Sequence, residues 1–453
     1  MNIPELVEKQ REYFFTYETY DVNFRLKVLK DIKALLFKYK ERFFEAFKKD
    51  YNKCAFDVTA TEFSLVIQEI NYMMKHLKKL VKPKKVSTAI VNFPSKGYIV
   101  PEPHGNVLII APWNYPLQLT LEPLIGAIAG GNTVIMKPSS YVENVSQVIY
   151  DMFEEYGHPE LIATVLGNRV QIQELLDEKF DYIFFTGGDT VGKIVLEKAA
   201  KHLCPCTLEL GGKSPCIVDK DADIEIAAKR IVWGKYINAG QTCVAPDYIC
   251  VHSSVHDKFL EKVKEYINKF YYVDGKIVDV FPYAVSEKHF NKILSLVDTE
   301  KVVFGGRTDG RLIEPMILDN VNFDDKIMSE EIFGPIMPII IYDDLKELFL
   351  KINKLPKPLA FYFFSQDKKL CMDVTKYKFF GGGCINDTIM HLTNDHLPFG
   401  GVGRSGMGSY HGKKSFETFS HYKSILRKGK MEVNTKYPPY NDKKLKLINF
   451  LYK

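Results

Sequence analysis

The sequence predicts an α/β fold with two domains built on parallel sheets and a separate β-rich arm. The first reason is length, because 453 residues exceed what one ordinary hydrophobic core holds. The second is the regular alternation, from residue 105 onward, of short apolar runs with amphipathic segments. Such alternation is typical of parallel strands connected by helices. The third is the segment 81–103, whose prolines and β-type residues fall outside this alternation.

Residues 4 to about 80 are predicted to be helical. Their apolar side chains recur at spacings of three, four and seven, with Lys and Glu between them. This pattern buries one face of each helix against a core. The region around Glu62 and Phe63 could instead line the mouth of a substrate site, but the pattern favours helical packing.

The segment 81–103 is predicted to form extended strands that leave the main body. Prolines stand near both ends, at Pro83 and at Pro101 and Pro103, with β-type residues between them. A lone domain would leave its apolar side chains exposed. We therefore expect this segment, together with the strand-like part of the C-terminal region, to lie in the subunit interface of a homodimer.

The alternation itself divides into two units, with a break near 209–212. The first unit predicts strands and helices at 107–111, 121–129, 133–137, 145–156, 182–186 and 191–202. The second predicts them at 216–218, 224–236, 248–251 and 255–266. The predicted domains are a first one of 1–80 and 103–210, a second one of 211–410, and an arm and tail of 81–102 and 411–453.

The composition excludes several classes of protein. Hydrophobic residues make up 46% and charged residues 26%, the proportions of a soluble globular protein. A net charge of +5 is small for this length, so no nucleic-acid partner is expected. The N-terminus lacks the pattern of a secretory signal, and no apolar run approaches the roughly 18 residues of a membrane span, so no stable membrane insertion is expected. The eight cysteines form no CxxC pair, so we expect no metal site and a reducing, cytoplasmic location.

Two segments carry candidate chemistry. Cys243 lies among small, turn-forming residues in the stretch 238–246, and Glu209 precedes a glycine pair in the stretch 209–215. A thiol on a tight loop is a candidate nucleophile, and the carboxylate is a candidate base. Each has a plainer interpretation as well. A free Cys is more often a small buried hydrophobe, and a Glu often caps a helix or forms an ion pair.

Further motifs accompany this pair in a fixed order. They are Pro112-Trp113-Asn114-Tyr115-Pro116, Lys137-Pro138-Ser139-Ser140, the glycine-containing stretch 185–192 and Glu331-Ile332-Phe333-Gly334-Pro335. The ordered set resembles the aldehyde dehydrogenase superfamily, from about residue 103 to about residue 421. The stretch 396–417 resembles the class 3 branch more narrowly, the branch that contains fatty and aromatic aldehyde dehydrogenases.

The resemblance implies NAD(P)-dependent oxidation of an aldehyde to a carboxylic acid. Cys243 would attack the aldehyde carbon to give a thiohemiacetal, and Glu209 would activate the water that hydrolyses the resulting thioester. The amide of Asn114, in a loop stiffened by two prolines, would donate to the developing oxyanion. An Asn that caps a turn is the alternative. The first domain would bind coenzyme, the second would carry the catalytic cysteine, and the arm would join subunits.

The coenzyme residues are also assigned by the resemblance. Gly187 and Gly192 would bring the backbone and a helix N-terminus to the pyrophosphate, where an ordinary strand-to-helix turn is the alternative. Glu331 would hold the nicotinamide ribose, with Phe333 packed beside the nicotinamide and Trp113 shaping the pocket. Asp189 stands where the family usually has an uncharged residue, and we expect its side chain to cap the following helix.

Lys137 and Ser140 are expected to lie at the adenosine ribose. Lys137 would donate to ribose hydroxyls, although a solvated loop Lys is the plainer interpretation. The family often carries Glu where this chain has Ser140, and that acid would repel a 2′-phosphate. With Ser140 the repulsion is absent, so we expect both NAD and NADP to be accepted.

Two other functions belong to the same resemblance. An acylating dehydrogenase would pass the thioester to coenzyme A, but such relatives tend to lack an acid at the position of Glu209. A binding protein that had lost turnover is disfavoured because Cys243, Glu209, Asn114 and Glu331 are all present. The substrate is expected to be an apolar aliphatic or aromatic aldehyde, since clusters such as 361–364 make the chain rich in aromatic residues.

Overall fold

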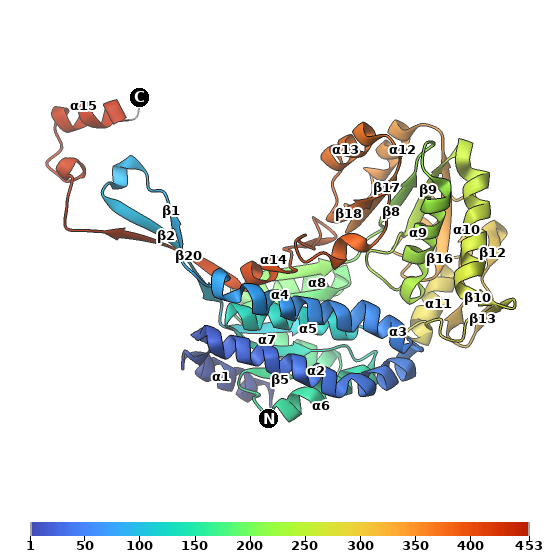
Figure 1. Ribbon diagram of the computed structural model, residues 1–453, viewed down its shortest axis with the longest axis horizontal. Helices are drawn as coiled ribbons and strands as arrows, with labels where there is room; N and C mark the ends of the chain where they lie inside the picture. Colours follow the sequence, from blue (N-terminus) through green and yellow to red (C-terminus); the bar gives the residue numbers. More distant parts are fainter. Residues whose placement is uncertain (1, 452–453) are drawn as a thin grey trace.

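The computed structural model describes residues 2–451 and has three parts. Figure 1 shows the N-terminal helices across the lower part of the molecule, a sheet with its own helices at the upper right, and a thin arm that projects away from both. This is the predicted α/β architecture, with two largely parallel sheets and a β-rich arm.

The first sheet has six strands in the order β19-β7-β6-β3-β4-β5, and all its pairs are parallel except that of β19 with β7. The strands are β3 (Asn106–Ile110), β4 (Thr133–Lys137), β5 (Ile162–Thr164), β6 (Tyr182–Gly187), β7 (Cys206–Leu210) and β19 (Gly406–Met407). The connecting helices are α5 (Pro116–Gly130), α6 (Glu143–Tyr156), α7 (Arg169–Asp177) and α8 (Asp189–Lys201). Every strand and helix predicted for this unit is present. The short β19 lies inside the range predicted for the second domain, so the chain returns to the first sheet late. The division into domains stays a prediction.

The N-terminal residues are helical, as the apolar spacing predicts. They form α1 (Ile3–Phe14), α2 (Val22–Tyr51), α3 (Ala55–Val58) and α4 (Ser64–Leu80). Helix α2 buries Leu29, Ile32 and Leu36 completely, and it packs against α6, while α4 packs against α5. Asp21 caps the start of α2, and Asn52 ends it in the left-handed conformation.

A buried ion pair fixes these helices to α5. Lys53 Nζ lies 2.9 Å from Glu62 Oε1, and both side chains are fully buried. The other oxygen of Glu62 accepts from the backbone N–H groups of Leu117 and Gln118, each at 3.0 Å. A carboxylate at a helix N-terminus satisfies unpaired N–H groups and offsets the positive end of the helix dipole. Glu62 therefore has a structural role at the start of α5, the helix that follows the Trp113–Tyr115 loop.

The second sheet has seven strands in the order β12-β15-β16-β9-β8-β17-β18. They are β8 (Pro215–Val218), β9 (Tyr248–His252), β12 (Val302–Gly305), β15 (Met316–Leu318), β16 (Ile336–Tyr342), β17 (Ala360–Phe364) and β18 (Gly382–Ile385). Its helices include α9 (Ile224–Tyr236), α10 (His256–Tyr271), α11 (Glu287–Ser295), α12 (Leu345–Ile352) and α13 (Lys368–Tyr377). The aromatic cluster 361–364 forms most of strand β17, which lies between β8 and β18, and is buried there, so it belongs to the core.

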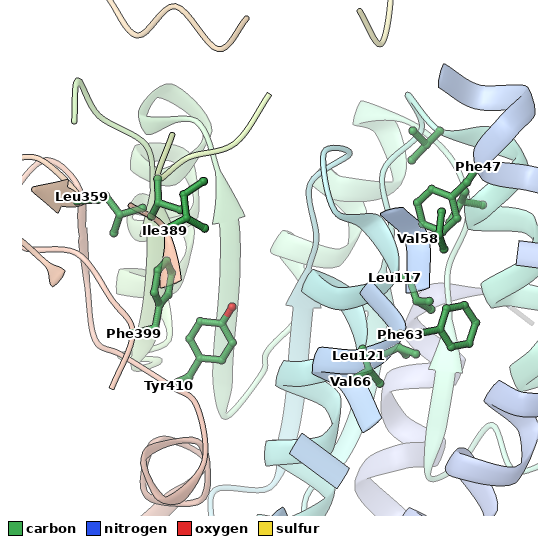
Figure 2. Packing of buried hydrophobic residues seen from close by; sticks show 14 of the residues in the cluster. Phe47, Val58, Phe63, Val66, Leu117, Leu121, Leu359, Ile389, Phe399 and Tyr410 are labelled. Atoms are coloured by element: carbon green, nitrogen blue, oxygen red, sulfur yellow. The ribbon is translucent and has the colours of Figure 1, made fainter. Parts of the chain in front are cut away.

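One hydrophobic cluster extends from the N-terminal helices to the second sheet. Figure 2 shows two parts of it: Phe63 faces Leu117 and Leu121 of α5, and Phe399 and Tyr410 lie beside Leu359 and Ile389. All of these side chains are buried. The loops that follow both sheets are therefore supported by continuous packing, which limits their movement.

The arm consists of three antiparallel strands, β1 (Lys84–Val86), β2 (Ser95–Pro103) and β20 (Ser420–Lys428). The predicted extended structure of 81–103 is confirmed, and β20 pairs with β2 along its full length. Between the body and β20, α14 (Lys413–Thr418) packs on α5. Beyond the arm, α15 (Asp442–Leu451) buries no residue, and residues 452–453 of the predicted tail lie outside the described part. No helix in the described residues has the length and apolar character needed to cross a membrane.

We expect the protein to sediment as a dimer at micromolar concentration. The reason is that the arm leaves Ile425 and Leu426 of β20 about half exposed on an edge strand, where a second chain would cover them. Replacing both with Asp should shift the sedimentation profile toward monomer. Leu350→Asp places the same charge on an exposed apolar side chain of α12 and is the control. A parent protein that sediments as a monomer would contradict the prediction.

Candidate active site

A cavity of about 820 Å³ lies where loops after both sheets meet. Its lining includes the loop 112–115 after β3, the end of β6 with the start of α8, the segment 209–213 between β7 and β8, and residues 242–244. Parallel sheets place ligands at the carboxyl ends of their strands. Seven of the predicted site residues line this one cavity, and they are Trp113, Asn114, Gly187, Glu209, Cys243, Glu331 and Phe333.

The loop that carries Cys243 is held in an unusual conformation. Three consecutive residues before it, Asn238, Ala239 and Gly240, have positive φ angles of 51°, 52° and 73°. A Cβ on Gly240 would come within 2.3 Å of the carbonyl oxygen of Gly334, so this position excludes any side chain. Gln241 fixes the loop from the other side, because its amide donates to the carbonyls of Asn238 and Tyr283 at 3.1 and 3.0 Å. The cysteine is therefore presented by a rigid turn.

The environment of Cys243 favours the neutral thiol. Burial, together with the nearby carboxyl groups of Glu331 and Glu209, raises the pKa of the Cys243 thiol to about 12. The thiolate is the nucleophilic form of cysteine. At neutral pH the thiol must therefore lose its proton when it reacts.

Glu209 is a second candidate catalytic group in the same cavity. It lies on β7, it is buried, and neither of its carboxyl oxygens has a hydrogen-bond partner among the described residues. Burial raises the pKa of this carboxyl well above its usual range. A buried carboxyl without a cap or an ion pair is costly for stability, and such groups concentrate at functional sites. Neither plainer interpretation of Glu209, a helix cap or an ion pair, fits this geometry.

Asn114 is tied to the cysteine loop rather than to its own turn. Its side-chain amide donates to the carbonyl of Gln241 at 3.1 Å, and its backbone carbonyl accepts from the amide of Asn238 at 2.9 Å. An amide carries two N–H groups. The bond to Gln241 uses one, and Asn114 lines the cavity, where the other can serve as a donor. Tyr115, the next residue, bonds through its hydroxyl to Thr242 at 2.7 Å, so two successive residues brace the loop beside Cys243.

The stretch 187–192 forms the turn from β6 into α8. A Cβ added to Gly188 would meet no atom within 4 Å, so open space faces this position. A Cβ on Gly192 would lie 2.9 Å from a methyl carbon of Leu210, so that glycine allows α8 to pack closely against β7. Helix α8 has no side-chain cap. Open space beside an uncapped helix N-terminus suits the pyrophosphate of a dinucleotide coenzyme.

The prediction that Asp189 caps α8 is wrong. Gly188 occupies the N-cap position, and Asp189 is the first residue of the helix. The carboxylate of Asp189 instead accepts two hydrogen bonds from Arg404, at 3.2 and 3.0 Å. The partner lies 215 residues away in sequence, so no local pattern could indicate it.

Glu331 is positioned by groups that the sequence analysis missed. Lys213 Nζ pairs with Asp247 at 2.5 Å and also donates to the carbonyls of Ile327 and Glu330. The other oxygen of Asp247 accepts from the N–H of Ile332 at 2.9 Å, so the segment on both sides of Glu331 is held. A Cβ on Gly211 would lie 2.1 Å from the carboxylate of Glu331, which explains the glycine there. Burial raises the pKa of the Glu331 carboxyl to about 8.

Three aromatic rings close one side of the cavity. The centroid of Trp113 lies 5.3 Å from that of Phe333 and 5.2 Å from that of His289, both in edge-to-face geometry. His289 Nε2 lies 2.9 Å from the carbonyl oxygen of Phe333. Burial lowers the pKa of His289 to about 4, so the neutral ring donates this bond and fixes Phe333, whose φ is 52°. His289 was not predicted because no motif surrounds it.

Lys137 and Ser140 do not line the cavity. The Lys137 side chain is buried and its Nζ donates to the carbonyl of Pro138 at 2.7 Å, while burial lowers its pKa to about 8. Ser140 is exposed at the turn between β4 and α6. The plainer interpretation of Lys137, a solvated loop residue, is wrong because the side chain is buried. Contact of either residue with the adenosine ribose stays a prediction.

The fold and the site together are those of an oxidoreductase that binds a dinucleotide coenzyme. The aldehyde dehydrogenase family model matches residues 1–425. The chain is 46% identical over 448 residues to the 4,4'-diaponeurosporen-aldehyde dehydrogenase of Staphylococcus aureus, covering 98% of this chain and 97% of that protein. It is 42% identical to the rat aldehyde dehydrogenase family 3 member A2, covering 98% and 93%. The dog enzyme named aldehyde dehydrogenase, dimeric NADP-preferring, is 41% identical, covering 96% and 98%.

The structural comparison agrees. A solved structure described as the substrate-bound state of Staphylococcus aureus AldH superposes with a TM-score of 0.97 over the full length of both chains, at 45% identity. The chain belongs to the aldehyde dehydrogenase family. It is an enzyme that oxidises aldehydes to carboxylic acids with NAD(P) as coenzyme.

Proposed function

We propose that Cys243 and Glu209 are the nucleophile and the water-activating base of this aldehyde dehydrogenase, and that its substrates are apolar aldehydes. The observation that carries the assignment is the meeting, in one cavity, of a thiol on a rigid turn and a buried carboxyl without a partner. Glu209 also argues against the transfer of the thioester to coenzyme A, because it supplies a base for water.

The chemistry follows from these groups. The sulfur of Cys243 bonds to the aldehyde carbon while the thiol releases its proton to solvent in the cavity. The carbonyl oxygen, now carrying negative charge, accepts a hydrogen bond from Asn114. The coenzyme, when bound, accepts the hydride that turns the thiohemiacetal into a thioester. Water then adds to the thioester carbon while Glu209 takes a proton from it, the carbon–sulfur bond breaks, and the acid leaves with the thiol restored. Glu331 and Phe333 would hold the nicotinamide end of the coenzyme, with Gly187 and Gly192 at the pyrophosphate.

The lining of the cavity supports apolar substrates. Beyond the chemical groups, many of its side chains are aliphatic or aromatic, and they include Phe56, Leu65, Leu119, Trp233, Ile237, Ile389, Met390, Leu392 and Phe399. Apolar walls stabilise a substrate roughly in proportion to the apolar area that it buries. The catalytic efficiency should therefore rise with the length of the aldehyde chain.

Phe56→Asp should lower kcat/KM for long straight-chain aldehydes by roughly tenfold, with little change for propanal. Phe56 lines the cavity and is 79% exposed, so its replacement leaves the core intact. A charge there opposes the burial of an alkyl chain but does not reach the aldehyde group. NAD(P)H formation across a series of chain lengths measures the effect, and Phe15→Asp, an exposed side chain outside the cavity, is the control. Equal losses for short and long aldehydes would contradict an apolar substrate channel.

Ser140→Glu should shift the coenzyme preference strongly toward NAD. An acid at the adenosine ribose repels the 2′-phosphate of NADP and accepts a hydrogen bond from the 2′-hydroxyl of NAD. Ser140 is exposed, so the replacement leaves the fold intact. The measurement is the ratio of kcat/KM with the two coenzymes, compared with Tyr141→Glu, which adds the same charge one residue later. A parent enzyme that rejects NADP, or an unchanged ratio, would show that Ser140 does not face the ribose.

We also propose a homodimer in the cytoplasm. The exposed apolar side chains of the arm support the dimer. All eight cysteines are free thiols, which supports a reducing compartment. Oxidative labelling of thiols in intact cells tests the proposed reducing compartment.

A further inference from the structure

Arg404 and Asp189 form an ion pair at the turn where the pyrophosphate of the coenzyme is proposed to bind. Arg404 donates through Nε and Nη2 to one carboxylate oxygen of Asp189, at 3.2 and 3.0 Å. Asp189 begins α8 at the expected pyrophosphate position, and Arg404 lies in the loop before β19. Both residues line the same cavity as Cys243. Lys193, one turn along α8, lies 3.8 Å from the same oxygen and is the other charged group recorded at Asp189 among the described residues.

The position of Arg404 does not depend on Asp189. Ser405, its neighbour, accepts from the N–H of Leu210 at 3.1 Å, and β19 pairs directly with β7. A Cβ on Gly401 would lie 2.1 Å from the carbonyl oxygen of Ser405, so the loop is packed tightly on itself. The backbone therefore holds Arg404 beside the start of α8 whether or not the ion pair forms.

The pair has an electrostatic consequence for a bound pyrophosphate. The hydrogen bonds from Arg404 hold the pKa of Asp189 below its usual range, so the carboxylate is charged at neutral pH. A negative charge at a helix N-terminus occupies the place that favours an anionic ligand. Without compensation, Asp189 would repel the two phosphates that a dinucleotide brings to the same turn.

We propose that Arg404 is a positioning residue for coenzyme affinity, which cancels the charge of Asp189 at the phosphate loop and so permits the pyrophosphate to bind. The inference rests on the proposed placement of the pyrophosphate at residues 187–192. It assigns Arg404 a role through Asp189, with no direct part in the chemistry at Cys243. It also explains how an acid can stand at Asp189, where the aldehyde dehydrogenase family usually has an uncharged residue.

Coenzyme binding without an aldehyde is the direct test. The two tryptophans of the chain, Trp113 and Trp233, both line the cavity, so quenching of tryptophan fluorescence reports the dissociation constant of NAD or NADP. Arg404→Gln should raise this constant roughly five- to tenfold at low salt. The difference from the parent should shrink at high salt, because exposed charges are screened. In steady-state assays KM for the coenzyme should rise, with kcat at saturation unchanged.

The double variant decides between compensation and direct contact. Asp189→Asn combined with Arg404→Gln removes both charges and should restore the dissociation constant to near the parent value. Arg307→Gln is the matched control, since it removes an exposed guanidinium that faces Glu314 away from the cavity. An unchanged constant in Arg404→Gln would overturn the proposal, and so would a loss that persists in full in the double variant.

A separate variant tests the placement of the pyrophosphate. Gly188→Leu introduces a side chain into open space with an ordinary negative φ of −78°, so the fold tolerates it. Loss of coenzyme binding in Gly188→Leu, with an unchanged melting temperature, supports the placement at residues 187–192. Normal binding in Gly188→Leu shows that the placement is wrong. A failure of the placement is thus distinguished from a failure of the role of Arg404.

Discussion

Replacing Cys243 with serine should abolish aldehyde oxidation, with a loss of about three orders of magnitude or more. A serine hydroxyl yields far less nucleophilic anion at neutral pH than a thiol does. The fold should be unaffected, because the turn is fixed by Asn238, Gly240 and Gln241 rather than by the thiol. Coenzyme binding, followed by tryptophan fluorescence, should stay near the parent level.

Two measurements complete this test. Cys384→Ser removes a half-buried thiol that does not line the cavity, and this control should retain activity. Mass spectrometry after treatment with a reactive aldehyde analogue should locate the covalent label on Cys243 first. Activity near the parent level in Cys243→Ser, or earlier labelling of another cysteine, would refute the assignment.

Glu209→Gln should slow hydrolysis of the thioester by roughly 10²–10⁴-fold, the usual contribution of a general base. Glutamine keeps the size of the side chain but cannot take a proton from water. Cys243 remains in place, so the first turnover should still form NAD(P)H. Rapid-mixing experiments should therefore show a burst of NAD(P)H followed by a slow steady state.

The burst distinguishes the possible roles of Glu209. Equal losses of burst and steady state would mean that Glu209 activates the thiol or supports the structure. Coenzyme A should not accelerate the parent enzyme, because water is the acceptor that Glu209 serves. Glu314→Gln changes a buried carboxyl outside the cavity and is the control for loss of stability.

Local patterns were sufficient for much of the fold. Apolar runs flanked by glycine and proline predicted the strands around 107–111 and 182–186, because buried parallel strands need little else. The spacing of apolar residues predicted the N-terminal helices, because a helix that packs on a core buries one face. The motif residues Cys243, Glu209, Asn114 and Glu331 also meet in one cavity, as their order suggested.

Contacts between distant segments could not be predicted in this way. Asp189 is a residue type that commonly caps helices. Only the fold brings Arg404 to it from 215 residues away in the sequence. Lys53 and Glu62 carry ordinary charges in the sequence, yet they are fully buried together under α5. His289 and Asp247 act by holding neighbouring segments, and their roles depend on which backbone groups lie opposite. No periodicity or motif in the sequence indicates any of these contacts.

The position of β19 bears on how the protein is made. Gly406 of β19 pairs with Glu209 of β7, so the strand that carries the proposed base gains its second neighbour from a segment that follows the whole second sheet in sequence. During synthesis the whole second sheet must emerge from the ribosome before that edge of β7 is covered. Contacts of such long sequence separation also slow folding, since the intervening chain must be ordered first. The carboxylate of the proposed base thus reaches its final environment only after the strands of the second sheet have been made and β19 has followed them.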